Sequence, residues 1–164
     1  MTLPAEVRLA WRRVPAGEHR RSISRALLTE LLPGAAFVSR CASCGGDHGR
    51  IRVVGTDAAV SVSYTDGWAF AVAGLGGACL GLDAVPAAAA GLERVLPRGD
   101  ARSWARVEAV LKADGRGLAV DPARVRVRAS TESGSWHARI DDDLPLAGWD
   151  VPGPPGVILA VARG

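Results

Sequence analysis

The chain is poor in aromatic residues and in long apolar stretches, and each shortage excludes a class of protein. Aromatic residues are 5% of 164, too few for a base-stacking platform of the RNA-binding kind. The most apolar stretches are interrupted by Asp66, Asp83 and Glu93, so none reaches the roughly 18 residues of a membrane span. The first residues also lack a signal-peptide core, so we expect a cytoplasmic protein with no membrane partner.

Lysine and cysteine are also scarce. Three cysteines, two of them close together, form no disulfide framework and fit a reducing compartment. Lys112 is the only lysine, so the net charge of +3 comes from arginine. Such a charge favours anionic small molecules or acidic protein surfaces over nucleic acid as partners. The lone lysine is either needed for its compact ammonium group or a product of drift on an exposed helix face.

What the chain does contain is typical of a folded α+β protein. Its residues are 48% hydrophobic, and 20 glycines and 10 prolines indicate many tight connections. Apolar periodicity and turn residues predict helices over residues 18–32, 86–96 and 101–113. Strands are predicted over residues 7–14, 51–54, 59–64, 68–73, 79–82, 125–129, 135–140 and 157–162.

The two halves of the chain share an order of predicted elements. Each half has a strand, a helix and further strands, and similar segments occur at residues 69–74 (AFAVAG) and 158–164 (ILAVARG). This order predicts two pseudo-symmetric lobes, residues 1–77 and 78–164, each a small antiparallel sheet packed with a helix. A ligand cleft is then expected between the lobes. The alternative is that alanine-rich strands look alike by composition.

The strongest cluster of chemical groups combines Asp83 with the helix that carries Glu108 and Lys112. At about 100° per residue, Glu108 lies at the edge of the apolar stripe and Lys112 follows one turn later. Asp83 ends a hydrophobic strand, and two anchored carboxylates facing one cleft are able to hold Mg²⁺. The alternative is a solvated Glu108–Lys112 pair, with Asp83 as a turn former.

The order of several motifs resembles the 4′-phosphopantetheinyl transferase superfamily, in its larger, two-lobed class, over about residues 19–164. The matching motifs are His48-Gly49-Arg50, residues 61–65 (SVSYT), Gly81-Leu-Asp83, and Trp104-x-x-x-Glu108-x-x-x-Lys112 followed by residues 115–118 (GRGL). The resemblance implies transfer of the phosphopantetheine arm from coenzyme A to a serine of an acyl or peptidyl carrier protein. The reaction would require Mg²⁺ and release adenosine 3′,5′-bisphosphate.

The resemblance also implies roles for single residues. Asp83 and Glu108 would be the metal ligands, and Glu108 is a candidate base for the carrier serine, directly or through water. Lys112 would neutralise or protonate the departing phosphate. The coenzyme A contacts would come from basic and hydroxyl side chains: Arg20, Arg50, Ser63 and Tyr64.

The sequence departs from the family pattern at several positions. Val85 stands where the family has a second acidic residue, and Tyr64 replaces a histidine. Val107 replaces a lysine, Ile51 a proline, and the region before Arg20 is shortened. A second hypothesis is therefore a catalytically degenerate protein that binds coenzyme A or a carrier protein and acts as a partner subunit.

The loop over residues 41–50 has two interpretations. Cys41, Cys44 and His48 offer three zinc ligands, but structural zinc sites take four, and His19 or Asp47 would have to complete the set. We favour a glycine-rich loop that places Arg50; the zinc alternative would suit a small basic nucleic-acid binder. The aspartates at 141–143 are predicted to solvate a turn and not to bind a metal.

Overall fold

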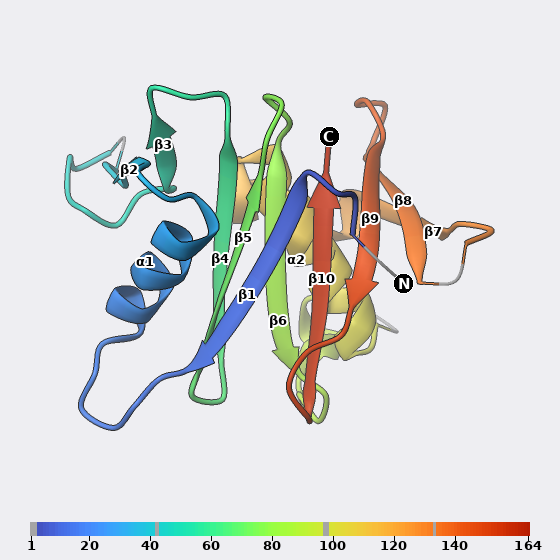
Figure 1. Ribbon diagram of the computed structural model, residues 1–164. Coiled ribbons are helices and arrows are strands. Elements are labelled where there is room, and N and C mark those ends of the chain that lie inside the picture. The colour runs from blue at the N-terminus through green and yellow to red at the C-terminus, as the bar shows by residue number, and fades with distance from the viewer. Residues whose placement is uncertain (1–2, 42, 97–98, 133) are drawn as a thin grey trace.

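The protein has an α+β fold of antiparallel sheets and two α-helices (Figure 1). This computed structural model describes residues 3–41, 43–96, 99–132 and 134–164. None of the helices in these ranges is both long enough and apolar enough to cross a membrane.

The N-terminal half, taken as residues 3–77, builds a three-stranded sheet in the order β1-β5-β4. Its strands are β1 (Val7–Arg13), β4 (Ala59–Thr65) and β5 (Trp68–Gly74), and helix α1 (Arg20–Leu31) packs on one face. The apolar stripe of α1, with Leu27 and Leu28 fully buried, lies on the alanines of β5. A separate ribbon pairs β2 (Ala36–Val38) with β3 (Arg52–Val54).

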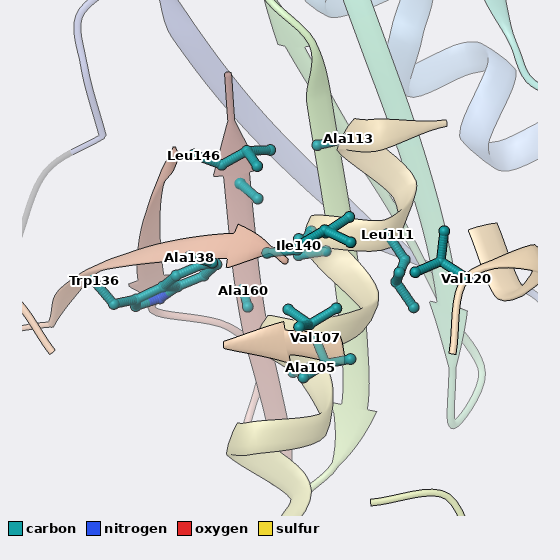
Figure 2. Close-up of a cluster of buried hydrophobic side chains, with 14 of the residues drawn as sticks. Ala105, Val107, Leu111, Ala113, Val120, Trp136, Ala138, Ile140, Leu146 and Ala160 are labelled. Atoms are coloured by element: carbon teal, nitrogen blue, oxygen red, sulfur yellow. The ribbon is translucent and has the colours of Figure 1, made fainter. Parts of the chain in front are cut away.

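The C-terminal half, residues 78–164, builds a five-stranded sheet in the order β6-β10-β9-β8-β7. The strands are β6 (Leu80–Pro86), β7 (Val125–Ala129), β8 (Ser135–Ile140), β9 (Leu146–Val151) and β10 (Val157–Arg163). Helix α2 (Ala101–Asp114) covers one face, and short 3-10 helices occur at Leu92–Arg94, Gly117–Ala119 and Pro122–Arg124. Figure 2 shows Val107 and Ala105 of α2 among Ile140, Ala138 and Trp136 of β8.

Alternation along the central strands explains how the two sheets share a core. Along β5 and β10 the alanines face the helices, whereas most of the larger apolar side chains face the other sheet. Phe70 and Val72 of β5 thus pack in one cluster with Leu159 and Val161 of β10. Small residues let each helix approach its sheet, and large ones fill the space between the sheets.

Most of the predicted elements are confirmed, and the differences have local causes. The helix predicted over residues 86–96 is wrong, because Gly91 adopts a left-handed conformation at φ 80° and only the 3-10 turn Leu92–Arg94 forms. Strands β2 and β9 were not predicted. In β9, Gly148 breaks the apolar pattern because a Cβ there would collide with the ring of Trp136.

The turn predicted at the aspartates is confirmed. Residues 141–143 form the turn after β8, and Asp141 and Asp143 pair with Arg124 and Arg116. These charges hold a solvent-exposed turn.

Candidate functional site

The two sheets meet along a seam between β4 and β6, and serine side chains of β4 bridge it. The Leu82 amide donates to Ser61 Oγ at 3.1 Å, and the Ala84 amide donates to Ser63 Oγ at 3.2 Å. Because hydroxyls replace a backbone ladder here, the two strands lie side by side without forming one continuous sheet. Asp83 lies between these two amides on β6.

Asp83 is a buried carboxylate with two polar partners. Its Oδ1 accepts from Ser63 Oγ at 3.0 Å and from Lys112 Nζ at 2.6 Å. Lys112 also donates to the Leu82 carbonyl at 3.1 Å, which anchors the ammonium group on β6. Only 7% of the Asp83 surface is exposed, so the paired cation is what makes burial of this charge tolerable. Both side-chain bonds end on Oδ1, and Oδ2 is the oxygen left for another cation.

Glu108 lies on α2 one turn before Lys112 and lines the same cavity as Asp83. Burial raises the pKa of Glu108, the negative charge of Asp83 raises it further, and Lys112 opposes this rise. Glu108 is half-buried and lines the cavity, so its carboxyl is partly shielded from water. This environment suits a carboxyl that accepts a proton or shares a cation.

Gly81 explains why these groups come together. A Cβ at this position would overlap the carbonyl oxygen of Ala109 and crowd the amide of Ala113, both in the backbone of α2. Glycine therefore allows the helix to lie directly on β6. The close approach brings Lys112 within reach of Asp83, so the glycine two residues before the aspartate shapes the site.

Two adjoining cavities open at this seam. One, of about 600 Å³, is lined by Asp83, Glu108, Arg20 and Trp104. The other, of about 470 Å³, lies between α1, β4 and the loop over residues 39–51. Val62, Tyr64 and Lys112 line both cavities, so an extended ligand would be able to occupy the two together.

Arginines surround both cavities. The Arg20 guanidinium stacks on the Tyr64 ring, 4.9 Å from its centroid, and the Tyr64 hydroxyl bonds Ser24 Oγ at 2.7 Å. Arg50 donates to the Ala113 carbonyl at 3.3 Å, near the end of α2. Gly115 lies beside it, and its φ of 91° is a left-handed conformation that favours glycine.

Arg25 lines the smaller cavity and was not among the site residues predicted from the sequence. Its Nη2 donates to Ser39 Oγ at 2.7 Å, whereas its buried Nη1 has no hydrogen-bond partner among the described residues. A buried donor of this kind is costly unless a ligand satisfies it. Its place on one face with Arg21, four residues earlier, was the signal available in the sequence.

The cysteine-bearing loop forms a wall of the smaller cavity. Cys41, Cys44 and His48 bring their ligand atoms within 4.8 Å of one another, and Cys44 Sγ lies 2.9 Å from His48 Nε2. Backbone amides of Cys44 and Ser43 hold the pKa of the Cys41 thiol below its usual value. All three cysteines of the chain are free.

The structure brings six of the seven predicted site residues to the larger cavity: Arg20, Ser63, Tyr64, Asp83, Glu108 and Lys112. Arg50 lies at the smaller one. Ser63 is bonded to Asp83, and its predicted contact with a phosphate stays a prediction. No protein-family model matches the chain, and no curated protein matches it either.

Proposed function

We propose that this protein transfers the 4′-phosphopantetheine arm of coenzyme A to a serine of an acyl or peptidyl carrier protein, in a Mg²⁺-dependent reaction in the cytoplasm. The observation that carries the proposal is a pair of carboxylates, Asp83 and Glu108, on a cavity that adjoins an arginine-lined one. Coenzyme A matches this arrangement, because it has a pyrophosphate in the middle and an anionic nucleotide at one end. The resemblance of the motifs to the transferase superfamily points the same way.

The smaller cavity suits the nucleotide. Its lining combines apolar side chains such as Ile51 and Val60 with the guanidinium groups of Arg21, Arg25 and Arg50. The unpartnered Nη1 of Arg25 would gain an acceptor from a phosphate oxygen. Lys112 lines both cavities and would contact the pyrophosphate.

The carboxylates suit Mg²⁺. The ion usually takes one or two protein carboxylates and fills its other positions with water and phosphate oxygens, which matches Asp83 Oδ2 and Glu108. Burial and, to a smaller extent, the charge of Asp83 raise the pKa of Glu108, and a cation between the two carboxylates would relieve their repulsion. When bound, Mg²⁺ would supply charge stabilisation at the pyrophosphate.

The chemistry assigned to the protein's own residues is a proton transfer and the neutralisation of a leaving group. The Glu108 carboxylate takes the proton of the carrier serine, directly or through water, as the serine oxygen forms its bond to the β-phosphorus of coenzyme A. The bond from this phosphorus to the bridging oxygen breaks, and adenosine 3′,5′-bisphosphate leaves with the electron pair. Lys112 Nζ neutralises the departing phosphate.

Two departures from the family pattern, Val85 and Tyr64, are compatible with the proposed site. Val85 is 5% exposed and packs with α2, so the side chain at this position belongs to the core and two carboxylates remain. Tyr64 replaces the family's histidine and supports Arg20 by stacking. The matching alternation of residues 69–74 and 158–164 supports the interpretation that two related lobes enclose the ligand.

A second candidate is a silent protein that binds coenzyme A or a carrier protein without transfer. The observation that favours it is the ion pair between Lys112 and Asp83 at 2.6 Å, which neutralises one of the two carboxylates without any metal. This candidate retains the arginine-lined cavity and predicts binding without release of the bisphosphate.

The deciding experiment is intact-mass spectrometry of apo carrier proteins incubated with the protein, coenzyme A and Mg²⁺. We expect a gain of one phosphopantetheine group that disappears with EDTA. In Glu108→Gln, the loading rate should fall by about 10²–10⁴-fold because a general base is lost. The matched control is Glu93→Gln, at an exposed glutamate in the 3-10 turn Leu92–Arg94, which should load normally. Equal loading by wild type and Glu108→Gln would refute the assigned roles; no loading, with coenzyme A still bound, would favour the silent protein.

A further inference from the structure

The loop over residues 39–51 contains a cluster of metal-ligating groups that phosphopantetheine transfer does not use. Cys41 Sγ, Cys44 Sγ and a ring nitrogen of His48 lie within 4.8 Å of one another. Tetrahedral zinc, with bonds of about 2.0–2.3 Å, holds its ligand atoms about 3.5–3.8 Å apart. The three ligand atoms therefore lie close to the spacing of three corners of a zinc tetrahedron.

The backbone around the sulfurs forms a tight turn that supports them. The Gly46 amide donates to Cys44 Sγ at 3.4 Å. The turn is closed by bonds from the Cys41 amide to the Gly46 carbonyl, at 2.8 Å, and from the Gly45 amide to the Cys41 carbonyl, at 2.9 Å. Gly45 has φ 72°, a conformation that glycine adopts without strain. Amide donors to ligand atoms are a common support of metal sites.

We propose that Cys41, Cys44 and His48 bind a zinc ion, with a water molecule at the fourth position. Two thiolates and an imidazole form a ligand set that suits Zn²⁺ and not Mg²⁺. The side chains that the sequence offered as a fourth ligand are otherwise engaged. Asp47 accepts from Ser39 and lies 3.9 Å from Arg25, and His19 Nδ1 caps α1 by accepting from the Arg21 amide. Cys44 and His48 are exposed, so water has access to the open position.

The ion would fix a segment that has little core of its own. The loop is flanked by β2 and β3, strands of three residues each, and most of its side chains are exposed. A metal crosslink stabilises such a segment in place of buried apolar surface. Because His48, Gly49 and Arg50 line the smaller cavity, zinc would hold that wall in its binding position.

The test is zinc reconstitution of the reduced, EDTA-stripped full chain, followed by elemental analysis after desalting. Wild type should retain one equivalent of zinc, and Co²⁺ in its place should show thiolate-to-metal charge-transfer absorption. Cys44→Ser and His48→Ala should each bind zinc at least about 10–100-fold more weakly. The matched control is Cys79→Ser, because Cys79 is exposed and lies outside the cluster, and it should retain one equivalent.

Amide hydrogen exchange of wild type with and without zinc guards against variants that simply fail to fold. Zinc should slow exchange at Ser43, Cys44 and Gly46 and leave α2 unchanged. Wild type that retains no zinc, or that forms a Cys41–Cys44 disulfide and excludes the metal, would overturn the proposal. So would equal zinc retention by wild type, Cys44→Ser and His48→Ala. The assays contain no coenzyme A, carrier protein or Mg²⁺, so their failure leaves the proposed transferase activity untouched.

Discussion

The two α-helices differ in how their N-terminal ends treat charge. Helix α2 begins with the carboxylate of Asp100, which accepts from the Ser103 amide at 2.7 Å, and ends at Gly115 in a left-handed conformation. Helix α1 is capped by the ring of His19, which accepts from the Arg21 amide, and it begins with the charged side chains of Arg20 and Arg21. Positive charge at a helix N-terminus opposes the helix dipole, so α1 is less stable than its composition allows.

The comparison indicates that the N-terminal end of α1 favours ligand binding, whereas α2 favours stability. The arginines at the N-terminal end of α1 destabilise the helix when no ligand is bound. The backbone amides and arginines at this end are favourable to a bound anion. Helix α2 is instead capped by the carboxylate of Asp100 and closely packed, and it carries Glu108 and Lys112. Departures from local rules of this kind are expected at functional sites.

The largest effect is expected from Gly81→Ala, which would disrupt the close contact between β6 and α2 in the C-terminal half. The added methyl would collide with the backbone of α2 at Ala109 and Ala113. We expect a loss of about 3 kcal/mol or more in the free energy of unfolding, measured by urea denaturation. The matched control is Gly74→Ala in β5, whose Cβ would lie 3.4 Å from Leu80, an ordinary contact. Equal stability of the two variants would show that α2 does not rest on β6 as described.

A smaller effect is expected at Asp150, which ties α2 to β9. Arg106 Nη2 and Arg102 Nη1 donate to Asp150 Oδ2 at 2.7 and 2.8 Å, and Trp136 Nε1 donates to Oδ1 at 3.1 Å. Asp150→Asn should cost about 2–3 kcal/mol at neutral pH, because two charged partners remain without their carboxylate.

The same variant has a defined pH dependence. Burial alone would raise the pKa of Asp150, but the hydrogen bonds from Arg106 and Arg102 outweigh it and lower the pKa below 3.8. A lowered folded pKa contributes stability above pH 3.8 that is lost as the pH falls through the folded value. The gap in melting temperature between wild type and Asp150→Asn should therefore narrow below pH 3.8. A gap that stays constant on acidification would contradict the account.

The smallest effect is an increase in stability from Glu108→Gln without Mg²⁺. Because burial and Asp83 raise the pKa of Glu108 above 4.5, ionisation of Glu108 weakens the fold as the pH rises from 4.5 through the folded value. At neutral pH, Glu108→Gln should melt a few degrees above wild type. The difference should disappear below pH 4.5, and calorimetry is the measurement. A variant less stable than wild type at neutral pH would contradict the like-charge repulsion.

Much of the fold follows from the sequence because its strands alternate clearly and its caps are local. The prediction of α2 succeeds since Asp100 and Gly115 mark its ends. Strand β9 could not be predicted, because Gly148 is set by the distant ring of Trp136. The site was likewise predictable only in part. Asp83, Glu108 and Lys112 were predicted from their spacing and from the resemblance. The ion pair of Lys112 with Asp83 and the unpartnered Arg25 nitrogen could not be predicted, because they depend on contacts between elements that are separate in the sequence.

The most direct test of the central claim is to separate binding from transfer with variants in opposite halves. Coenzyme A binding is measured by calorimetry in EDTA, and carrier loading is measured with Mg²⁺ on the same preparations. We predict that Arg25→Met weakens coenzyme A binding by about 10–100-fold, whereas Arg128→Met, at an exposed arginine of β7, does not. Glu108→Gln should bind like wild type and fail to load the carrier. Loss of coenzyme A binding in Glu108→Gln, with unchanged binding in Arg25→Met, would contradict the account.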